Sequence, residues 1–142
     1  MIQTLPFEKL HYQFFLKDNL FVVESSASIT FEDILVHVGN LMNDEKFHIG
    51  LNGLYDFSQL QKVTGDHDAF LATAEAMSDH DIIAKPAKTA ILVADDSPDI
   101  YNIFHHYVLM TSESLIEYQL FTSSEVAKLL NFLEIEMLPD ID

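Results

Sequence analysis

Short apolar runs alternate along this chain with segments whose apolar residues recur every three or four positions. The two clearest runs, residues 53–58 and 90–96, each end at acidic residues and are each followed by a helical pattern. Runs of this kind are typical of strands that are buried on both faces of a parallel sheet. The acidic residues are then expected at the carboxyl edge, where open α/β sheets carry their working loops.

The other runs complete a sheet. Residues 11–26 predict a hairpin whose tight turn is Lys17-Asp18-Asn19, because Asp and Asn tolerate left-handed backbone. Further strands are expected at about 50–57, 88–94 and 115–121, and residues 58–66 are expected to form a loop that carries Gly65.

Four helices are predicted between and after these strands. Thr30 with Asp33 and Thr122 with Glu125 form capping-box patterns, and Ser97-Pro98 is typical of a helix start. A fourth helix is expected over about 67–80. The residues expected to face inward include Phe31, Ile34, Leu35, Val38, Leu41, Met42, Phe70, Leu71, Ala74, Met77, Ile100, Ile103, Phe104, Tyr107, Val108, Val126, Leu129, Leu130 and Leu133.

The order of these elements predicts an α/β fold. It is a five-stranded, mixed but mostly parallel sheet, in which the initial hairpin adds an antiparallel edge strand, covered by about four helices. We expect one domain over residues 1–142, with a core at about 11–134 and a frayed acidic tail at 135–142.

The amino-acid composition limits the kinds of partner that this protein can bind. The formal net charge of −16 comes from 23 acidic residues against seven lysines, and there is no arginine. Such a surface repels nucleic acid and anionic bilayers. Residues 1–20 show no signal-peptide core, no apolar run is long enough for a membrane span, and there are no cysteines. These features predict a cytoplasmic protein.

Reactive chemistry has few candidates. Asp56, Asp95 and Asp96 could meet at the sheet edge and hold Mg²⁺, which would make a metal-dependent enzyme the third hypothesis for function. None of the seven histidines forms an i, i+4 pair, and His37, His48 and His80 are expected at the surface. No nucleotide-binding glycine motif occurs, so no cofactor is predicted.

One surface patch is expected on the hairpin. Phe14 and Phe15 are neighbours in a strand and must point to opposite sides, so at least one should face away from the main sheet face. An exposed aromatic residue there predicts a docking patch or a homodimer contact.

The runs Leu20–Ser26, Thr30–Leu35, Leu54–Ser58 and Lys88–Asp96, with the ending Leu120–Leu133, resemble the small bacterial SpoIIAA-like proteins of the STAS type. The resemblance covers about residues 11–134. It implies a five-stranded mixed sheet and a role in partner binding rather than catalysis. The serine that is phosphorylated in one branch of the family would fall near Gly65, beside Thr64 and Asp66, but the D-S-S-G loop of that branch is absent here.

Two hypotheses for function rank above the metal-dependent enzyme. The first is a non-catalytic regulatory module that binds a protein partner through an edge formed by Asp56, Ser58, Thr64, Asp66, Asp95 and Asp96. The alternative is a binder or sensor of a small apolar or lipid-like ligand, because other SpoIIAA-like proteins resemble lipid-binding CRAL-TRIO domains. In that case the helices at about 66–80 and 98–111 would part from the sheet to expose a pocket.

Overall fold

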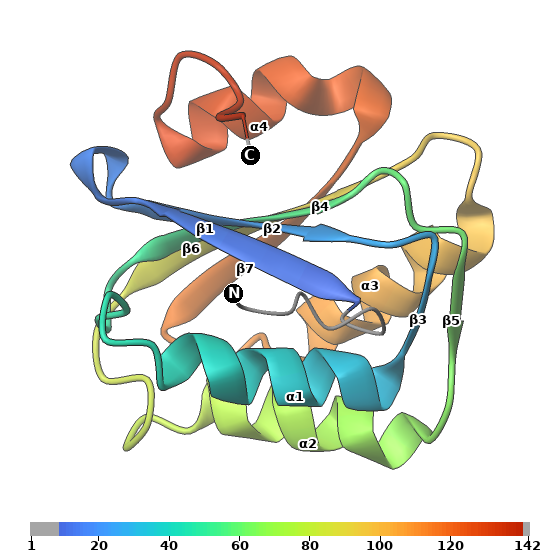
Figure 1. Cartoon of the computed structure of the whole chain (residues 1–142), viewed down its shortest axis with the longest axis horizontal. Coiled ribbons are helices and arrows are strands. Elements are labelled where there is room, and N and C mark those ends of the chain that lie inside the picture. The colour runs from blue at the N-terminus through green and yellow to red at the C-terminus, as the bar shows by residue number, and fades with distance from the viewer. Residues whose placement is uncertain (1–8, 141–142) are drawn as a thin grey trace, which may run out of the picture.

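A computed structural model describes residues 9–140 and contains the predicted five-stranded sheet (Figure 1). The strand order is β1-β2-β4-β6-β7; β1 is antiparallel to β2 and all other neighbours are parallel. The predicted fold class is therefore confirmed. The strands of this sheet are β1 (Leu10–Phe15), β2 (Leu20–Ser25), β4 (Asn52–Phe57), β6 (Ala87–Val93) and β7 (Ile116–Thr122).

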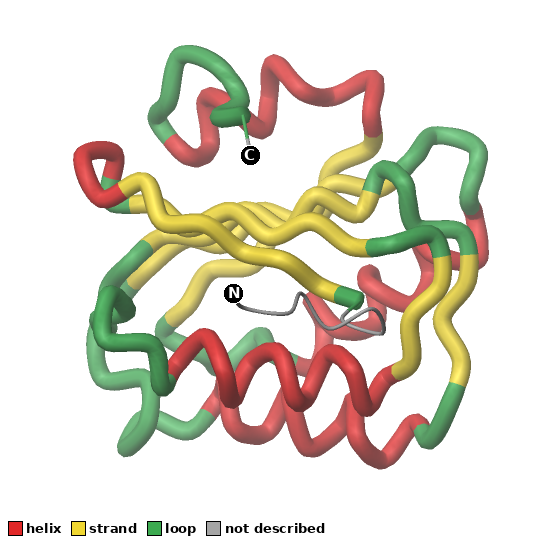
Figure 2. Tube along the Cα trace, viewed as in Figure 1, coloured by secondary structure: helices red, strands yellow, loops and turns green. Residues whose placement is uncertain are grey.

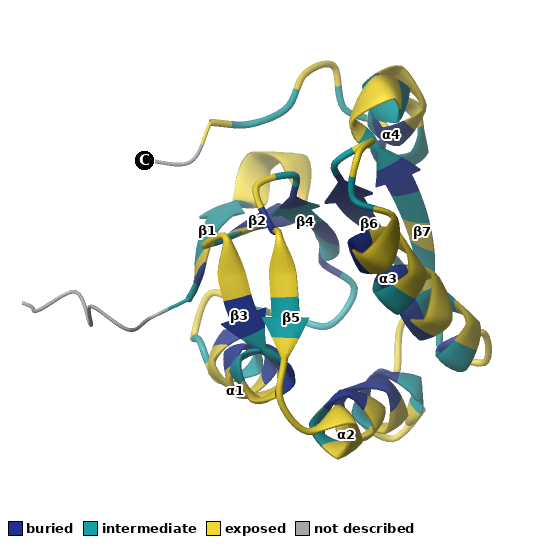
Figure 3. Ribbon diagram, turned by 90° about the vertical axis from the view of Figure 1, so that its right-hand side faces the viewer, coloured by how far each residue is buried: buried dark blue, intermediate teal, exposed yellow. Residues whose placement is uncertain are grey.

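The helices form two unequal layers on the sheet. Three helices cover one face, and the fourth lies alone on the opposite face (Figures 1 and 2). Each helix carries both buried and exposed residues, dark blue and yellow in Figure 3. The three helices of the first layer are α1 (Phe31–Met42), α2 (His67–Ser78) and α3 (Pro98–Met110), and the helix on the other face is α4 (Val126–Leu133).

A second, very small sheet was not predicted. Strands β3 (Ser28–Thr30) and β5 (Lys62–Thr64) pair in parallel, with Ile29 opposite Val63. The segment 58–66, expected as a loop, therefore contains a strand. Two short 3₁₀ helices, Leu16–Asp18 and Ser123–Glu125, complete the elements.

The predicted turn and caps are confirmed in part. Asn19 closes the hairpin turn with φ of 52°, and the Thr30 and Thr122 capping boxes both form. Ser97 does precede α3, but its side chain makes no capping hydrogen bond.

Some inward positions were wrong. Leu35 and Leu71 are each 37% exposed, because each lies at the margin of its helix's apolar stripe. On α2 the inward place is taken by Thr73, whose hydroxyl donates to the Ala69 carbonyl oxygen of its own helix.

The C-terminal segment is more ordered than a frayed tail. Ile135 and Leu138 pack against the core under α4, and the Ile135 amide donates to the Leu130 carbonyl oxygen. Residues 141–142 of the predicted tail, like residues 1–8 of the segment inspected for a signal peptide, lie outside the described part. Within the described residues, no helix is both long enough and apolar enough to cross a bilayer.

Candidate functional site

The predicted edge residues Asp56 and Ser58 form a local turn at the end of β4. One carboxylate oxygen of Asp56 accepts hydrogen bonds from the Ser58 amide, at 3.0 Å, and from the Ser58 hydroxyl, at 2.6 Å. Both side chains are half-buried. This carboxylate therefore stabilises the chain where it leaves the sheet.

Asp95 and Asp96 follow β6, the strand beside β4, and both are exposed. Asp95 Oδ1 accepts from the amide and the hydroxyl of Ser124, each at 3.1 Å. The Ser124 amide and the Thr122 side chain lower the pKa of the Asp95 carboxyl. Asp95 thus connects the loop after β6 to the 3₁₀ helix after β7.

Thr64 and Asp66 lie apart from these residues, at the end of β5 and the start of α2. Asp66 caps α2 by accepting from the Asp68 amide, and its own amide donates to Glu32 of α1 at 3.2 Å. Thr64 is exposed. Within residues 9–140, no group of three or more His, Asp or Glu side chains is placed to hold a metal ion.

Phe14 and Phe15 point to opposite faces of the sheet, as predicted. Phe14 packs against the core under the three helices, and Phe15 packs against the core under α4. Both rings are half-buried. The docking or homodimer role stays a prediction.

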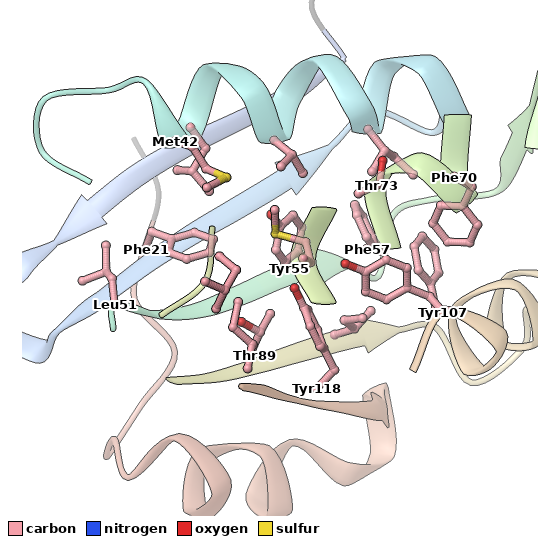
Figure 4. A pocket seen from close by; sticks show the side chains of 18 of the residues that line it. Phe21, Met42, Leu51, Tyr55, Phe57, Phe70, Thr73, Thr89, Tyr107 and Tyr118 are labelled. Carbon is pink, nitrogen blue, oxygen red and sulfur yellow. The ribbon is translucent and has the colours of Figure 1, made fainter. Parts of the chain in front are cut away.

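A cavity lies between the sheet and α1, α2 and α3 (Figure 4). Its volume is about 60 Å³, which is more than one water molecule needs but less than the roughly 150 Å³ of a preformed cavity that holds benzene, so a ring-sized ligand requires the wall to move outward. The cavity is lined by Phe21, Ile34, Val38, Leu41, Met42, Phe47, Leu51, Tyr55, Phe57, Phe70, Thr73, Met77, Ile83, Thr89, Ile91, Phe104, Tyr107, Ile116 and Tyr118.

Successive side chains of a strand point to opposite faces of the sheet, and this alternation decides which residues of β4 line the cavity. On β4, Gly53, Tyr55 and Phe57 share one side of the strand, while Leu54 faces α4. A side chain at Gly53 would overlap the ring of Phe21. The missing side chain therefore allows the tip of the Phe21 ring to lie over Gly53 of β4, where Phe21 forms part of the wall.

Aromatic contacts hold the rest of the wall in place. Phe57 and Phe104 stack with centroids 4.7 Å apart, and Phe70 stacks on Tyr107 at 5.2 Å. Tyr118 packs edge-on against Tyr107 at 5.0 Å. These contacts join β4, β7, α2 and α3 around one apolar space.

His37 is the polar residue that the sequence analysis misplaced. It was expected at the surface, but it is 4% exposed and lies on the inner side of α1. Its Nε2 forms a hydrogen bond of 3.0 Å with the hydroxyl of Tyr55. Burial lowers the pKa of His37 to about 4, so the imidazole is neutral at neutral pH.

A signal for His37 was present. His37 lies three positions after Ile34 and four before Leu41, which is the spacing of a buried helix face. The cavity itself had no sequence signal, because its lining residues have the pattern of an ordinary core.

Comparison of the chain with protein-family models, with curated proteins and with solved structures found no match. The resemblance to SpoIIAA-like proteins therefore stays a prediction.

Proposed function

We propose that this protein binds a small apolar ligand in the cavity between the sheet and α1, α2 and α3. The observation that carries the proposal is the composition of the cavity wall. Of the 19 side chains of the described residues that line it, 14 are Phe, Ile, Val, Leu or Met, three are tyrosines, and two, Thr73 and Thr89, are threonines. Ligand pockets of proteins have this character, with mostly apolar walls and a few polar groups.

The opposite face of the sheet supports this interpretation by contrast. There α4 alone covers the strands, and Leu129 and Leu133 are 0% and 4% exposed. Those residues pack with Phe121 and Leu92 into a separate core. Protein interiors are usually close-packed, so the space retained under the three helices supports a binding site there.

Solvent lies nearest to the cavity at one end. Met42 at the end of α1, Phe47 in the following loop and Ile116 at the start of β7 all line the cavity and are only half-buried. A ligand would enter there as this loop and the two element ends move outward, which also widens the cavity. Movement of α2 and α3 away from the sheet, as the sequence analysis predicts, would be a second route of entry for the ligand.

Filling the cavity tests the proposal. Val38→Phe adds a ring at a lining position of α1, whereas Val36→Phe adds the same ring on the solvent side of that helix, where the residue is 61% exposed. Naphthalene should raise the melting temperature of the wild type and of Val36→Phe, because a ligand that binds only the folded state stabilises it. It should not raise that of Val38→Phe.

Freshly purified protein provides the second measurement. Organic extraction and native mass spectrometry should show an apolar compound bound to the wild type and to Val36→Phe, in amounts much reduced for Val38→Phe. Circular dichroism establishes that each variant is folded. A protein that carries no compound and gains no thermal stability from naphthalene would contradict the proposal.

The regulatory protein-interaction module stays a prediction. The described residues add no observation that favours it over ligand binding, and the two hypotheses differ in which residues matter. The predicted edge depends on exposed groups such as Thr64 and Asp95, whereas ligand binding depends on the cavity wall.

A further inference from the structure

Three tyrosines bring hydroxyl groups to the cavity from three different elements. Tyr55 belongs to β4, Tyr107 to α3 and Tyr118 to β7, and all three line the cavity. Figure 4 shows the hydroxyl groups of Tyr107 and Tyr118 turned toward each other, beside Tyr55. Tyr55 and Tyr118 are only half-buried, which fits side chains that border an open space.

These hydroxyl groups are neutral. Desolvation raises the pKa of Tyr55, Tyr107 and Tyr118 above the usual value. The neighbouring tyrosine raises the pKa of Tyr55 and Tyr118 further, whereas the hydrogen bond with Tyr118 lowers that of Tyr107 without cancelling the effect of desolvation. The imidazole behind Tyr55 is neutral as well. No aspartate, glutamate or lysine from the described part of the chain lines the cavity.

An uncharged, apolar wall discriminates between ligands. A carboxylate that entered would lose its hydration without gaining a cation, which is strongly unfavourable. A neutral hydroxyl or carbonyl group would lose much less, and a tyrosine hydroxyl can both donate and accept a hydrogen bond. The same site therefore suits alcohols, phenols and ketones and rejects acids of the same size.

We propose that the cavity selects an uncharged apolar molecule with one hydroxyl or carbonyl group, which hydrogen-bonds to the tyrosine cluster formed by Tyr55, Tyr107 and Tyr118. The inference rests on the proposed function and names the ligand class for that site. The aromatic rings around the cluster favour a flat ligand body.

Three probes that share the naphthalene ring system separate the effects of the apolar rings, a hydroxyl group and a negative charge. 2-Naphthol carries a neutral hydroxyl at pH 7.5, 2-naphthoate carries a charge, and naphthalene has no polar group. Titration calorimetry or probe fluorescence should give 2-naphthol the lowest Kd. 2-Naphthoate should bind at least about tenfold more weakly than 2-naphthol, and naphthalene should lie between them.

Tyr→Phe variants test whether the tyrosine cluster causes the preference for 2-naphthol over naphthalene. Tyr118→Phe should raise the Kd of 2-naphthol about tenfold, toward that of naphthalene, while the Kd of naphthalene stays the same. Tyr55→Phe is the second variant, used if Tyr118→Phe does not fold. Tyr101→Phe, on the exposed side of α3, is the matched control and should change neither Kd.

The outcomes distinguish the two proposals. If 2-naphthoate binds as tightly as 2-naphthol, or if both tyrosine variants keep the wild-type preference for 2-naphthol over naphthalene, this inference is overturned while ligand binding stands. If neither naphthalene nor 2-naphthol binds, both proposals are overturned.

Discussion

A single buried histidine links the helix layer to the sheet. His37 of α1 is 4% exposed, and its hydrogen-bond partner is the hydroxyl of Tyr55 on β4. The unfolded chain takes up a proton on this imidazole near pH 6.5, whereas the folded protein does so only near pH 4. Because the unfolded state binds more protons at this imidazole between these values, the contribution of His37 to the free energy of unfolding falls as the pH falls through this window.

The effect is measurable well above the pH at which carboxylates titrate. Between pH 7.5 and pH 5.5 the wild type should lose about 1 kcal/mol of stability through this group. Urea unfolding of His37→Gln should lack that loss, because glutamine does not titrate. The exposed His105→Gln is the matched control and should retain the wild-type dependence. Parallel pH profiles for the wild type and His37→Gln would contradict the assignment.

Sequence patterns were least informative about individual polar residues. The spacing on α1 would allow His37 to be buried, but its partner, Tyr55, lies on another element, 18 positions along the chain. Whether a histidine is buried depends on whether such a partner reaches it. The placement of His37 therefore required the tertiary structure.

At the scale of elements, the structure separates two helix starts that look equally good in sequence. Thr30 accepts a hydrogen bond of 3.0 Å from the Asp33 amide, and the Asp33 carboxylate accepts one of 2.8 Å from the Thr30 amide. Ser97, before Pro98, makes no such bond. Only the first cap supplies hydrogen bonds to its helix.

Alanine at each cap checks this difference. Thr30→Ala should lower the free energy of unfolding by about 1 kcal/mol, because it leaves the Asp33 amide in the first turn of α1 without its side-chain partner. Ser97→Ala, the same kind of truncation at α3, should change it by less than about 0.5 kcal/mol. Chemical denaturation of both variants measures the two costs, and equal losses would show that the caps are equivalent.

The elements themselves were largely predictable. The five strands of the main sheet and all four helices follow from the periodicity of the apolar residues, because each buries a continuous face. Strands β3 and β5 were missed because each has three residues, and only Ile29 among them is fully buried. Such short strands exist through their mutual pairing, which no local pattern records.

At the scale of the whole molecule, the cavity is an outcome of packing that the sequence does not record. Ile34, Phe57 and Phe104 have the pattern of core residues whether or not space remains between them. The space depends on how far three helices stand from one face of the sheet. The candidate site was therefore predicted only as a general alternative, without its residues.

Net charge also acts on the molecule as a whole. The chain carries 23 acidic residues against seven lysines. Within residues 9–140, the two ion pairs are Lys88–Glu134, at 3.9 Å, and Lys128–Glu125, at 3.5 Å. Repulsion among the remaining carboxylates opposes the compact state, and salt screens this repulsion.

Stability should therefore rise with salt. Raising sodium chloride from about 20 mM to about 500 mM shortens the screening length several-fold and should raise the Tm at pH 7.5 by several degrees, on the order of 5 °C. Sucrose at equal osmolality is the control for preferential exclusion. Sodium and potassium chloride should act alike, because screening depends on ionic strength. A Tm that stays constant or falls with salt would mean that the acidic side chains are spaced widely enough for their repulsion to cost the fold little.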